Sequence, residues 1–426
     1  MDHEMKQTPM HGRHLALGAN MGCFAGYDMP MWYKRGAREE HLAVLATAGL
    51  FDTSHMAVID VTGEKAFDLL QTCFSRDLGK IHPQPQISPA TSRCAYGVFL
   101  NDRGGVIDDA IVYPMSSSRY LVVVNAGNGF SICSHLQAHS LDAGLAINDL
   151  TGLTGKLDIQ GPLSGRILAA AGAFDHMAEP IMAYFSFQGD FKENPIGPRI
   201  QGKPILLSRT GYTGEFGFEI IAENADILEI WDYLMVVGES YGMLPCGLAA
   251  RDSLRAGALL PLSHQDIGDW IFLNHPWTMA LPFNSSRTGF TKDFVGGKAL
   301  LENLGTCQSF TYPFAGFDLR KVSVDRMPQV IEGDGRQVGK VLTCVTDMGI
   351  GRHQGRIVSV TDPDVTKNFT VKGLSCGFLM ADTALNAGDC VTLDDGSRKI
   401  EVEIRTDIRP CKTASASMKA MMSFDE

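Results

Sequence analysis

The 426-residue sequence has no hydrophobic run long enough to cross a membrane. A transmembrane helix needs roughly 20 consecutive apolar residues, and no stretch here approaches that length. The opening residues, Met1–Lys6, also lack the apolar core of a secretory signal peptide. The sequence therefore predicts a cytoplasmic protein without a membrane partner.

An excess of basic residues is also missing. The chain has 37 Lys and Arg against 48 Asp and Glu, which gives a net charge of −11. Proteins that bind nucleic acid usually present a positively charged surface to the phosphate backbone. We therefore expect no nucleic-acid partner.

The ten cysteines, from Cys23 to Cys411, include no C-x-x-C pair. This spacing argues against zinc ribbons and thioredoxin-like redox sites, and in a reducing compartment most cysteines behave as small buried apolar residues. His135 and His139 lie four residues apart, but no H-E-x-x-H motif frames them. We interpret both as surface residues of a helix and expect no metal site.

Nucleotide-binding fingerprints are absent as well: no P-loop ending in Gly-Lys-Ser/Thr and no G-x-G-x-x-G after a strand is present. The prominent glycine-rich stretch is instead Ser208–Ile220, with three glycines between positions 211 and 217. Such a backbone can turn tightly and approach a ligand closely. Glu219 follows in an alternating strand pattern, so it either faces solvent or accepts hydrogen bonds from a ligand.

Two other segments carry complementary chemistry. Residues 104–112 form a glycine turn that leads into a strand through Asp108 and Asp109, and residues 246–255 form a turn into a helix that carries Arg251. By themselves the two acids would most simply cap a hairpin, and Arg251 would form a surface ion pair. Together with Glu219, they suit a flat polar ligand with an anionic tail.

The length allows two or three domains. We expect a loosely held N-terminal tail over 1–22, two α+β lobes over 23–290, a β-barrel over 291–412 and a frayed tail over 413–426. The lobes divide near residue 150, at about 23–150 and 151–290, and may interleave. The barrel assignment depends on short strands separated by Gly and Asp turns.

These motifs occur together in one known family. The chain resembles the folate-dependent aminomethyltransferases, which comprise the T-protein of the glycine cleavage system and its relatives. The resemblance covers roughly residues 20–300. Its motifs, in chain order, are Phe24–Pro30, Gly49–Met56, Gly104–Val112, Val124–Ala126, Gln160–Pro162, Arg209–Glu219, Gly247–Arg255, Gln265–Asp266 and Lys292–Gly296.

The resemblance implies an α+β, three-domain cloverleaf: two α+β lobes plus a C-terminal β-barrel around a central folate channel. It implies a tetrahydrofolate-dependent one-carbon transferase, most simply a glycine-cleavage-type aminomethyltransferase that forms 5,10-methylenetetrahydrofolate. By position, Asp109 matches the catalytic aspartate, Glu219 the pterin-binding glutamate and Arg251 the arginine that meets folate. Further pocket residues implied by the resemblance are Tyr96, Tyr212 and Asn125.

Several positions depart from the family pattern and leave the one-carbon donor open. Phe216 replaces a small or acidic residue, Ala256-Gly257-Ala258 replaces Leu-Glu-Ala, and 347–370 resembles an insertion that carries Arg352. The donor is therefore either borne by a lipoyl carrier protein or a small molecule. The second case would make the chain a tetrahydrofolate-dependent demethylase of an S-, N- or O-methyl compound. A third alternative is a non-catalytic folate-binding accessory protein.

Overall fold

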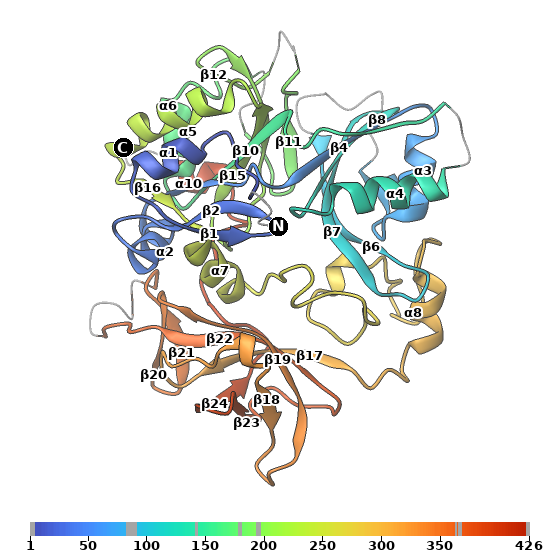
Figure 1. The fold of residues 1–426 in the computed structure, drawn as a ribbon, viewed down its shortest axis with the longest axis vertical. Helices are drawn as coiled ribbons and strands as arrows, with labels where there is room; N and C mark the ends of the chain where they lie inside the picture. Colours follow the sequence, from blue (N-terminus) through green and yellow to red (C-terminus); the bar gives the residue numbers. More distant parts are fainter. Residues whose placement is uncertain are drawn as a thin grey trace.

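Two α+β lobes stand beside each other above a β-barrel in the computed structural model (Figure 1). The structure describes residues 5–81, 92–140, 144–177, 181–192, 197–362, 364 and 369–422. This arrangement confirms the α+β class and the C-terminal β-barrel expected from the sequence. In the part of the chain that is described, no helix is long and apolar enough to span a bilayer.

The first lobe is built on a five-stranded antiparallel sheet. Its spatial order is β6 (Ala95–Leu100), β7 (Val106–Ser116), β8 (Arg119–Val124), β4 (Ala57–Thr62) and β9 (Ala146–Asp149). The predicted hairpin is present, because β6 and β7 pair around the 101–105 turn. Helices α3 (Ala66–Cys73) and α4 (Gly129–His139) cover one face, and their apolar sides share a core with the sheet.

The second lobe interleaves with the first along the chain. Its seven-stranded sheet has the order β16 (Leu244–Cys246), β3 (Gly49–Asp52), β10 (Thr154–Gln160), β15 (Gly217–Glu223), β14 (Leu206–Ser208), β11 (Ser186–Gln188) and β5 (Ser92–Arg93). Strand β3 comes from the N-terminal part of the chain, yet it lies between β10 and β16. Helices α5 (Ser164–Ala170) and α6 (Ile227–Glu239) pack on this sheet.

The two sheets face each other across a shared apolar layer. Val58 and Leu121 from the first sheet meet Phe187, Leu206 and Ile221 from the second in one buried cluster. Burial of such side chains contributes roughly 25 cal/mol per Å² of apolar surface. The lobes therefore have a fixed relative position, which matters because the candidate site draws residues from both.

The barrel closes through six strands, which leaves it without an exposed sheet edge. Its order is β17 (Phe310–Gly316), β22 (Leu374–Ala381), β19 (Gln337–Asp347), β18 (Gln329–Ile331), β23 (Cys390–Asp394) and β24 (Lys399–Ile404). Helix α8 (Gly297–Asn303) precedes it and packs through Leu300 against the first lobe. Part of the expected insertion forms the hairpin of β20 (Ile350–His353) and β21 (Arg356–Ser359). Small two-stranded sheets also pair β1 (Asn20–Phe24) with β2 (Tyr27–Trp32) and β12 (Arg199–Ile200) with β13 (Lys203–Pro204).

Neither end of the described chain is a loose tail. Before β1, helix α1 (His11–Ala16) places Met10 and His14 at 0% exposure, and His14 Nε2 hydrogen-bonds Asp52 at 2.9 Å. Near the C-terminus, α10 (Met418–Met422) buries Met418 in the core of the second lobe. The expected tails are thus corrected for the described parts of 1–22 and 413–426, because both segments complete apolar cores.

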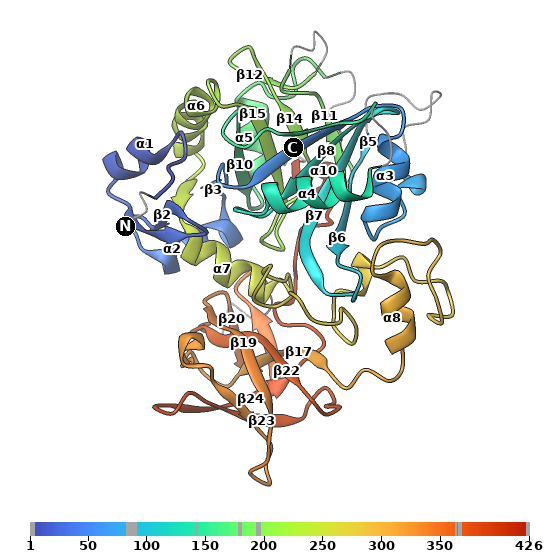
Figure 2. The same cartoon turned by 45° about the vertical axis from the view of Figure 1, so that its right-hand side comes forward.

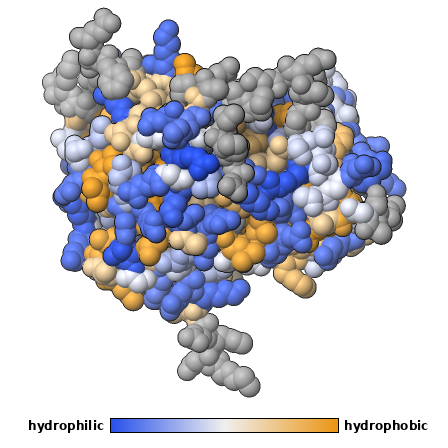
Figure 3. Space-filling view, turned by 90° about the horizontal axis from the view of Figure 1, so that it is seen from above, coloured by the Kyte–Doolittle hydropathy of each residue, from blue (hydrophilic) through white to orange (hydrophobic). Residues whose placement is uncertain are grey.

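Helix α7 (Leu248–Gly257) lies where the lobes meet the barrel (Figure 2). It contacts α2 (Ala37–Ala46), β2 and the barrel strands β19 and β22. On the face seen from above, hydrophobic residues form small patches among hydrophilic ones (Figure 3).

Candidate functional site

A central cavity of about 1050 Å³ opens between the lobes, α7 and the barrel. Its wall is formed by residues from all three parts of the molecule, including Met56 of the first lobe, Phe185 of the second and Val345 of the barrel. A cavity of this size holds a ligand somewhat larger than a typical drug molecule. All six residues singled out in the sequence line it: Tyr96, Asp109, Asn125, Tyr212, Glu219 and Arg251.

Asp109 lies at the first-lobe end of the cavity. Strand β7 presents it next to β6 and β8, and their side chains reach it from both sides. The Tyr96 hydroxyl donates to one carboxylate oxygen at 2.9 Å, and Asn125 Nδ2 donates to the other at 2.6 Å. Asn125 also donates to Asp108 at 2.8 Å, so one amide links the two adjacent acids.

The surroundings of Asp109 favour its neutral form. Burial, and then the negative charge of Asp108, raise the pKa of Asp109 to about 7, although the hydrogen bonds from Tyr96 and Asn125 act in the opposite direction. Among the described residues, no lysine or arginine forms an ion pair with Asp109. A carboxyl group with a pKa near 7 can exchange a proton at neutral pH, which suits acid–base work.

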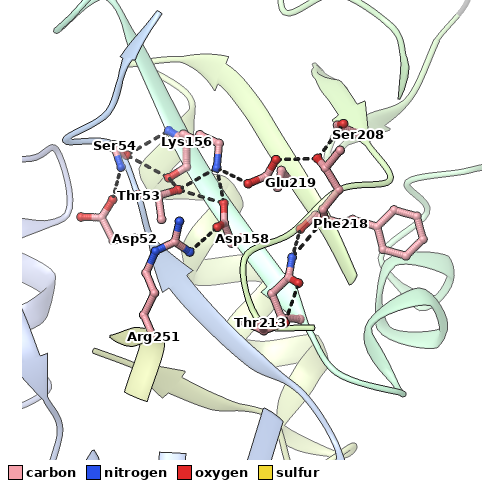
Figure 4. Close-up of polar contacts among 12 residues, drawn as sticks. Asp52, Thr53, Ser54, Lys156, Asp158, Ser208, Thr213, Phe218, Glu219 and Arg251 are labelled. Atoms are coloured by element: carbon pink, nitrogen blue, oxygen red, sulfur yellow. Dashed lines mark hydrogen bonds and ion pairs between the residues drawn. The ribbon is translucent and has the colours of Figure 1, made fainter. Parts of the chain in front are cut away.

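Glu219 lies at the second-lobe end, in a different environment (Figure 4). It is 5% exposed and is held by Lys156 Nζ at 2.7 Å and by the Thr210 hydroxyl. Lys156 also bonds Asp158, its neighbour two positions along β10. Because Asp158 and Glu219 are directly opposite each other in the β10–β15 pair, one ammonium serves both carboxylates.

Arg251 connects this charge network to α7. Its Nη1 donates to Asp158 at 2.6 Å, and its guanidinium lies 4.8 Å from the centre of the Tyr212 ring. Burial acts to raise the pKa of Asp158, but the charges of Lys156 and then Arg251 outweigh it and lower the pKa to about 2. Asp158 therefore stays ionised at neutral pH.

The start of α7 fixes where Arg251 can reach. Gly247 precedes the helix, and its N–H donates to Glu40 Oε2 at 2.9 Å. A Cβ at Gly247 would lie 2.4 Å from the Met31 carbonyl group, so no larger residue fits without a backbone shift. Farther along the helix, Arg255 turns away from the lobes and donates to Thr343 of the barrel at 3.0 Å.

Lys156 and Asp158 are the site residues that the sequence analysis missed. Both belong to β10, which comes directly before the Gln160-Gly161-Pro162 motif. Side chains two positions apart in a strand share a face, and buried charges require partners. The two-residue spacing of Lys156 and Asp158 is therefore the sequence feature that indicates a charged pair on one face of the strand, facing Glu219.

Other expectations for polar residues have mixed outcomes. His55 lines the cavity, and its buried Nδ1 has no hydrogen-bond partner among the described residues. Burial lowers the pKa of His55 to about 4. Arg352 of the expected insertion bonds Glu403 at 2.6 Å and does not line the cavity. His135 and His139, interpreted as surface residues, are each half-buried.

The two ends of the cavity thus offer different chemistry within one space. One end presents a carboxyl group that can change its charge near neutral pH. The other presents Glu219 paired with Lys156, and Arg251 beside them. Tyr96 and Tyr212 add flat aromatic surface between polar groups, an arrangement that suits a planar ligand with hydrogen-bonding edges.

Comparison with known proteins identifies the family to which these features belong. The model of the GCVT N-terminal domain matches residues 10–276, which is more than half of the chain. An aminomethyltransferase from Frankia alni is 37% identical over 340 residues, covering 79% of this chain and 85% of the relative. An aminomethyltransferase from Symbiobacterium thermophilum is 35% identical over 349 residues, covering 80% and 86%.

A solved structure gives the same result for the fold. The crystal structure of the glycine cleavage system aminomethyltransferase T from Bartonella henselae superposes with a TM-score of 0.74 and 27% identity. The match covers 94% of this chain and 97% of that one. The agreement therefore extends through both lobes and the barrel, beyond the residues matched by the domain model.

Proposed function

The chain belongs to the aminomethyltransferase family of the glycine cleavage system, and from this premise we propose that it transfers a one-carbon unit to tetrahydrofolate. One observation carries the proposal. The six residues that the sequence resemblance marks, from five separate segments, line a single cavity that has a titratable acid at one end and Glu219 with Lys156 and Arg251 at the other.

The residues present fit tetrahydrofolate. The pterin ring is planar and has adjacent N–H donors, which a carboxylate such as Glu219 can accept in a two-point contact. Both Glu219 oxygens already accept one hydrogen bond each, and each oxygen has a second lone pair for a ligand. Arg251 supplies a positive charge for an anionic tail, and the cavity volume is sufficient for the whole molecule.

When bound, tetrahydrofolate supplies the nucleophilic nitrogen that accepts the one-carbon unit. The protein's own contribution centres on Asp109, whose carboxyl group can hold or release a proton at neutral pH and whose anion stabilises positive charge that develops nearby. Asn125 and Tyr96 keep this carboxyl group in one orientation through its two oxygens. Glu219 and Arg251 bind and orient the acceptor.

For the donor, we propose an aminomethyl group carried on the lipoyl arm of a partner protein. Seven relatives with 31–37% identity over most of the chain are aminomethyltransferases, and no contact among the described cavity residues specifically favours a small methylated compound. A soluble carrier would meet the enzyme in the cytoplasm.

Isothermal titration of tetrahydrofolate tests the acceptor. We expect wild type to bind in the micromolar range and Glu219→Gln to bind roughly 10- to 100-fold more weakly, because a hydrogen bond to a charged group is lost. Glu223→Gln is the matched control, since Glu223 is exposed at the end of the same strand. No binding by wild type, or equal loss in both variants, would refute the folate site.

Turnover with defined donors tests the other substrate. An aminomethyl-loaded lipoyl protein should yield 5,10-methylenetetrahydrofolate, whereas small S-, N- or O-methyl compounds should yield no methylated folate. The reverse pattern would identify a demethylase. Folate binding without turnover of any donor would favour an accessory protein.

A further inference from the structure

Outside the central cavity, one cysteine and two histidines meet where α3 and α4 lie side by side on the first lobe (Figure 2). Cys73 is the last residue of α3, and His135 and His139 lie one turn apart near the end of α4. Their potential ligand atoms all lie within 4.8 Å of one another. None of the three residues lines the cavity.

Two polar atoms of this cluster, the Cys73 thiol and His135 Nε2, lack hydrogen-bond partners among the described residues. Cys73 is fully buried, and no hydrogen bond joins its thiol to another residue in the described part of the chain. The Nε2 atom of His135 is also buried and has no hydrogen-bond partner. Buried polar atoms without partners are rare, and an unfilled ion site is one explanation for them.

The neighbouring contacts orient the imidazoles as metal ligands require. His139 Nδ1 bonds the backbone carbonyl of His135 at 2.9 Å, so it carries the proton and the Nε2 lone pair is left available. Metal-binding histidines almost always have such a bond from their second nitrogen. Phe99 lies edge-on to the His135 ring at 6.1 Å and limits its rotation on the other side.

We propose that Cys73, His135 and His139 form a binding site for a Zn²⁺-class ion that links α3 to α4. One thiolate and two imidazoles are the ligand types that such an ion prefers over Mg²⁺ or Ca²⁺. Tetrahedral Zn²⁺ with bonds of about 2.0–2.3 Å places its ligands roughly 3.4–3.6 Å apart, so binding draws the widest pair about 1 Å closer.

A fourth position would remain for solvent, because three protein ligands leave a tetrahedral ion incomplete. Both histidines are half-buried rather than fully enclosed, which gives an ion a route to the site. The site lies beside Phe99 of β6, the strand that also carries Tyr96 at the proposed active site.

Zinc titration of the full chain, stripped with a chelator and kept reduced, tests this site by calorimetry. We expect one ion per wild-type chain, and at least about a 100-fold weaker affinity for Cys73→Ser and for His139→Gln, since each variant loses a direct ligand. Cys133→Ser and His176→Gln are the matched controls. Cys133 is another buried cysteine, on α4, and His176 is an exposed histidine outside the cluster.

Cobalt absorption provides an independent readout. Co²⁺ bound to wild type should give a thiolate-to-metal charge-transfer band that disappears in Cys73→Ser and persists in Cys133→Ser. If Cys73→Ser does not fold by circular dichroism, His139→Gln and the wild-type cobalt spectrum still decide the question. Absence of a saturable wild-type site, or equally tight binding by the ligand variants and the controls, would overturn the proposal.

Discussion

The two ends of the cavity use the same acidic residue types in opposite electrostatic environments. Asp109 has only neutral hydrogen-bond donors and a neighbouring acid, and its pKa is raised to about 7. Asp158 and Glu219 share Lys156, and Asp158 also pairs with Arg251. A carboxyl group without a cation can move a proton near neutral pH, whereas paired carboxylates keep a constant charge.

This difference assigns a separate task to each end. Proton exchange and stabilisation of changing charge belong at Asp109, because its ionisation is finely balanced. Recognition of a fixed ligand pattern belongs at Glu219, because its partners hold it in place. Substitution of Asp109 should therefore lower mainly the rate of transfer. Substitution of Glu219 should weaken mainly the binding of tetrahydrofolate.

The largest effect should come from removing the titratable group. Asp109→Asn keeps the shape of the side chain but cannot take up or release a proton, so we expect kcat to fall by roughly 10²–10⁴-fold. Single-turnover formation of 5,10-methylenetetrahydrofolate would measure the loss. The dissociation constant of tetrahydrofolate should stay within about tenfold of wild type.

An equal loss of folate affinity and rate in Asp109→Asn would contradict this separation of tasks. It would mean that Asp109 mainly binds the ligand. Glu219→Gln is the comparison variant, since it should weaken binding first.

Next in size is the effect of removing the shared cation. Lys156→Met leaves Asp158 and Glu219 facing each other in a buried strand pair, so we expect the free energy of unfolding to fall by about 3 kcal/mol. Urea denaturation would measure it. Adding Asp158→Asn should recover at least about 1 kcal/mol, because it removes the repulsion between the facing carboxylates of Asp158 and Glu219.

The exposed pair Lys298–Glu302 supplies the control for this variant. Lys298→Met should change the free energy of unfolding by less than about 0.5 kcal/mol, since solvent screens surface pairs. Similar losses in the two Lys→Met variants would show that Lys156 has no special role in neutralising the site.

A smaller effect should appear in the pH dependence of stability. The pKa of Asp158 is about 2 in the folded protein and about 3.9 when unfolded, so the unfolded state binds the extra proton as the pH falls. The contribution of Asp158 to the free energy of unfolding is therefore present above pH 4 and is lost toward pH 2. Between pH 5 and pH 3 the loss should be about 1 kcal/mol.

Asp158→Asn should remove this contribution and flatten the curve of unfolding free energy against pH by that amount. Urea denaturation at pH 5, 4 and 3 would measure the difference. An unchanged slope would indicate that Asp158 is not selectively stabilised as an anion.

Short-range patterns explain what the sequence could predict. The glycine turn and alternation at 104–112 correctly predicted the hairpin that carries Asp109, and the Gly-rich stretch correctly led into the strand that carries Glu219. Only the family resemblance predicted that residues 109, 219 and 251 share a cavity, because no local pattern in the sequence indicates that they meet.

Long-range register explains what the sequence did not predict. Lys156 serves Glu219 only because β10 and β15 pair in one particular alignment. Cys73 approaches His135 only through the packing of two helices from different parts of the chain. The N-terminal segment was misjudged for the same reason, since the bond from His14 to Asp52 spans 38 positions.

The smallest effect should come from adjusting the hydrogen bonds at Asp109. If the carboxylate is the active form, kcat/KM should fall as the pH decreases through about 7. Tyr96→Phe removes a donor that favours the anion, so this acidic limb should move to higher pH. Asp108→Asn removes a like charge, so the acidic limb should move to lower pH.

Profiles of kcat/KM between pH 5 and 9 would measure both variants. Opposite shifts would identify Asp109 as the titrating group, whereas shifts in one direction would place the titration elsewhere in the cavity.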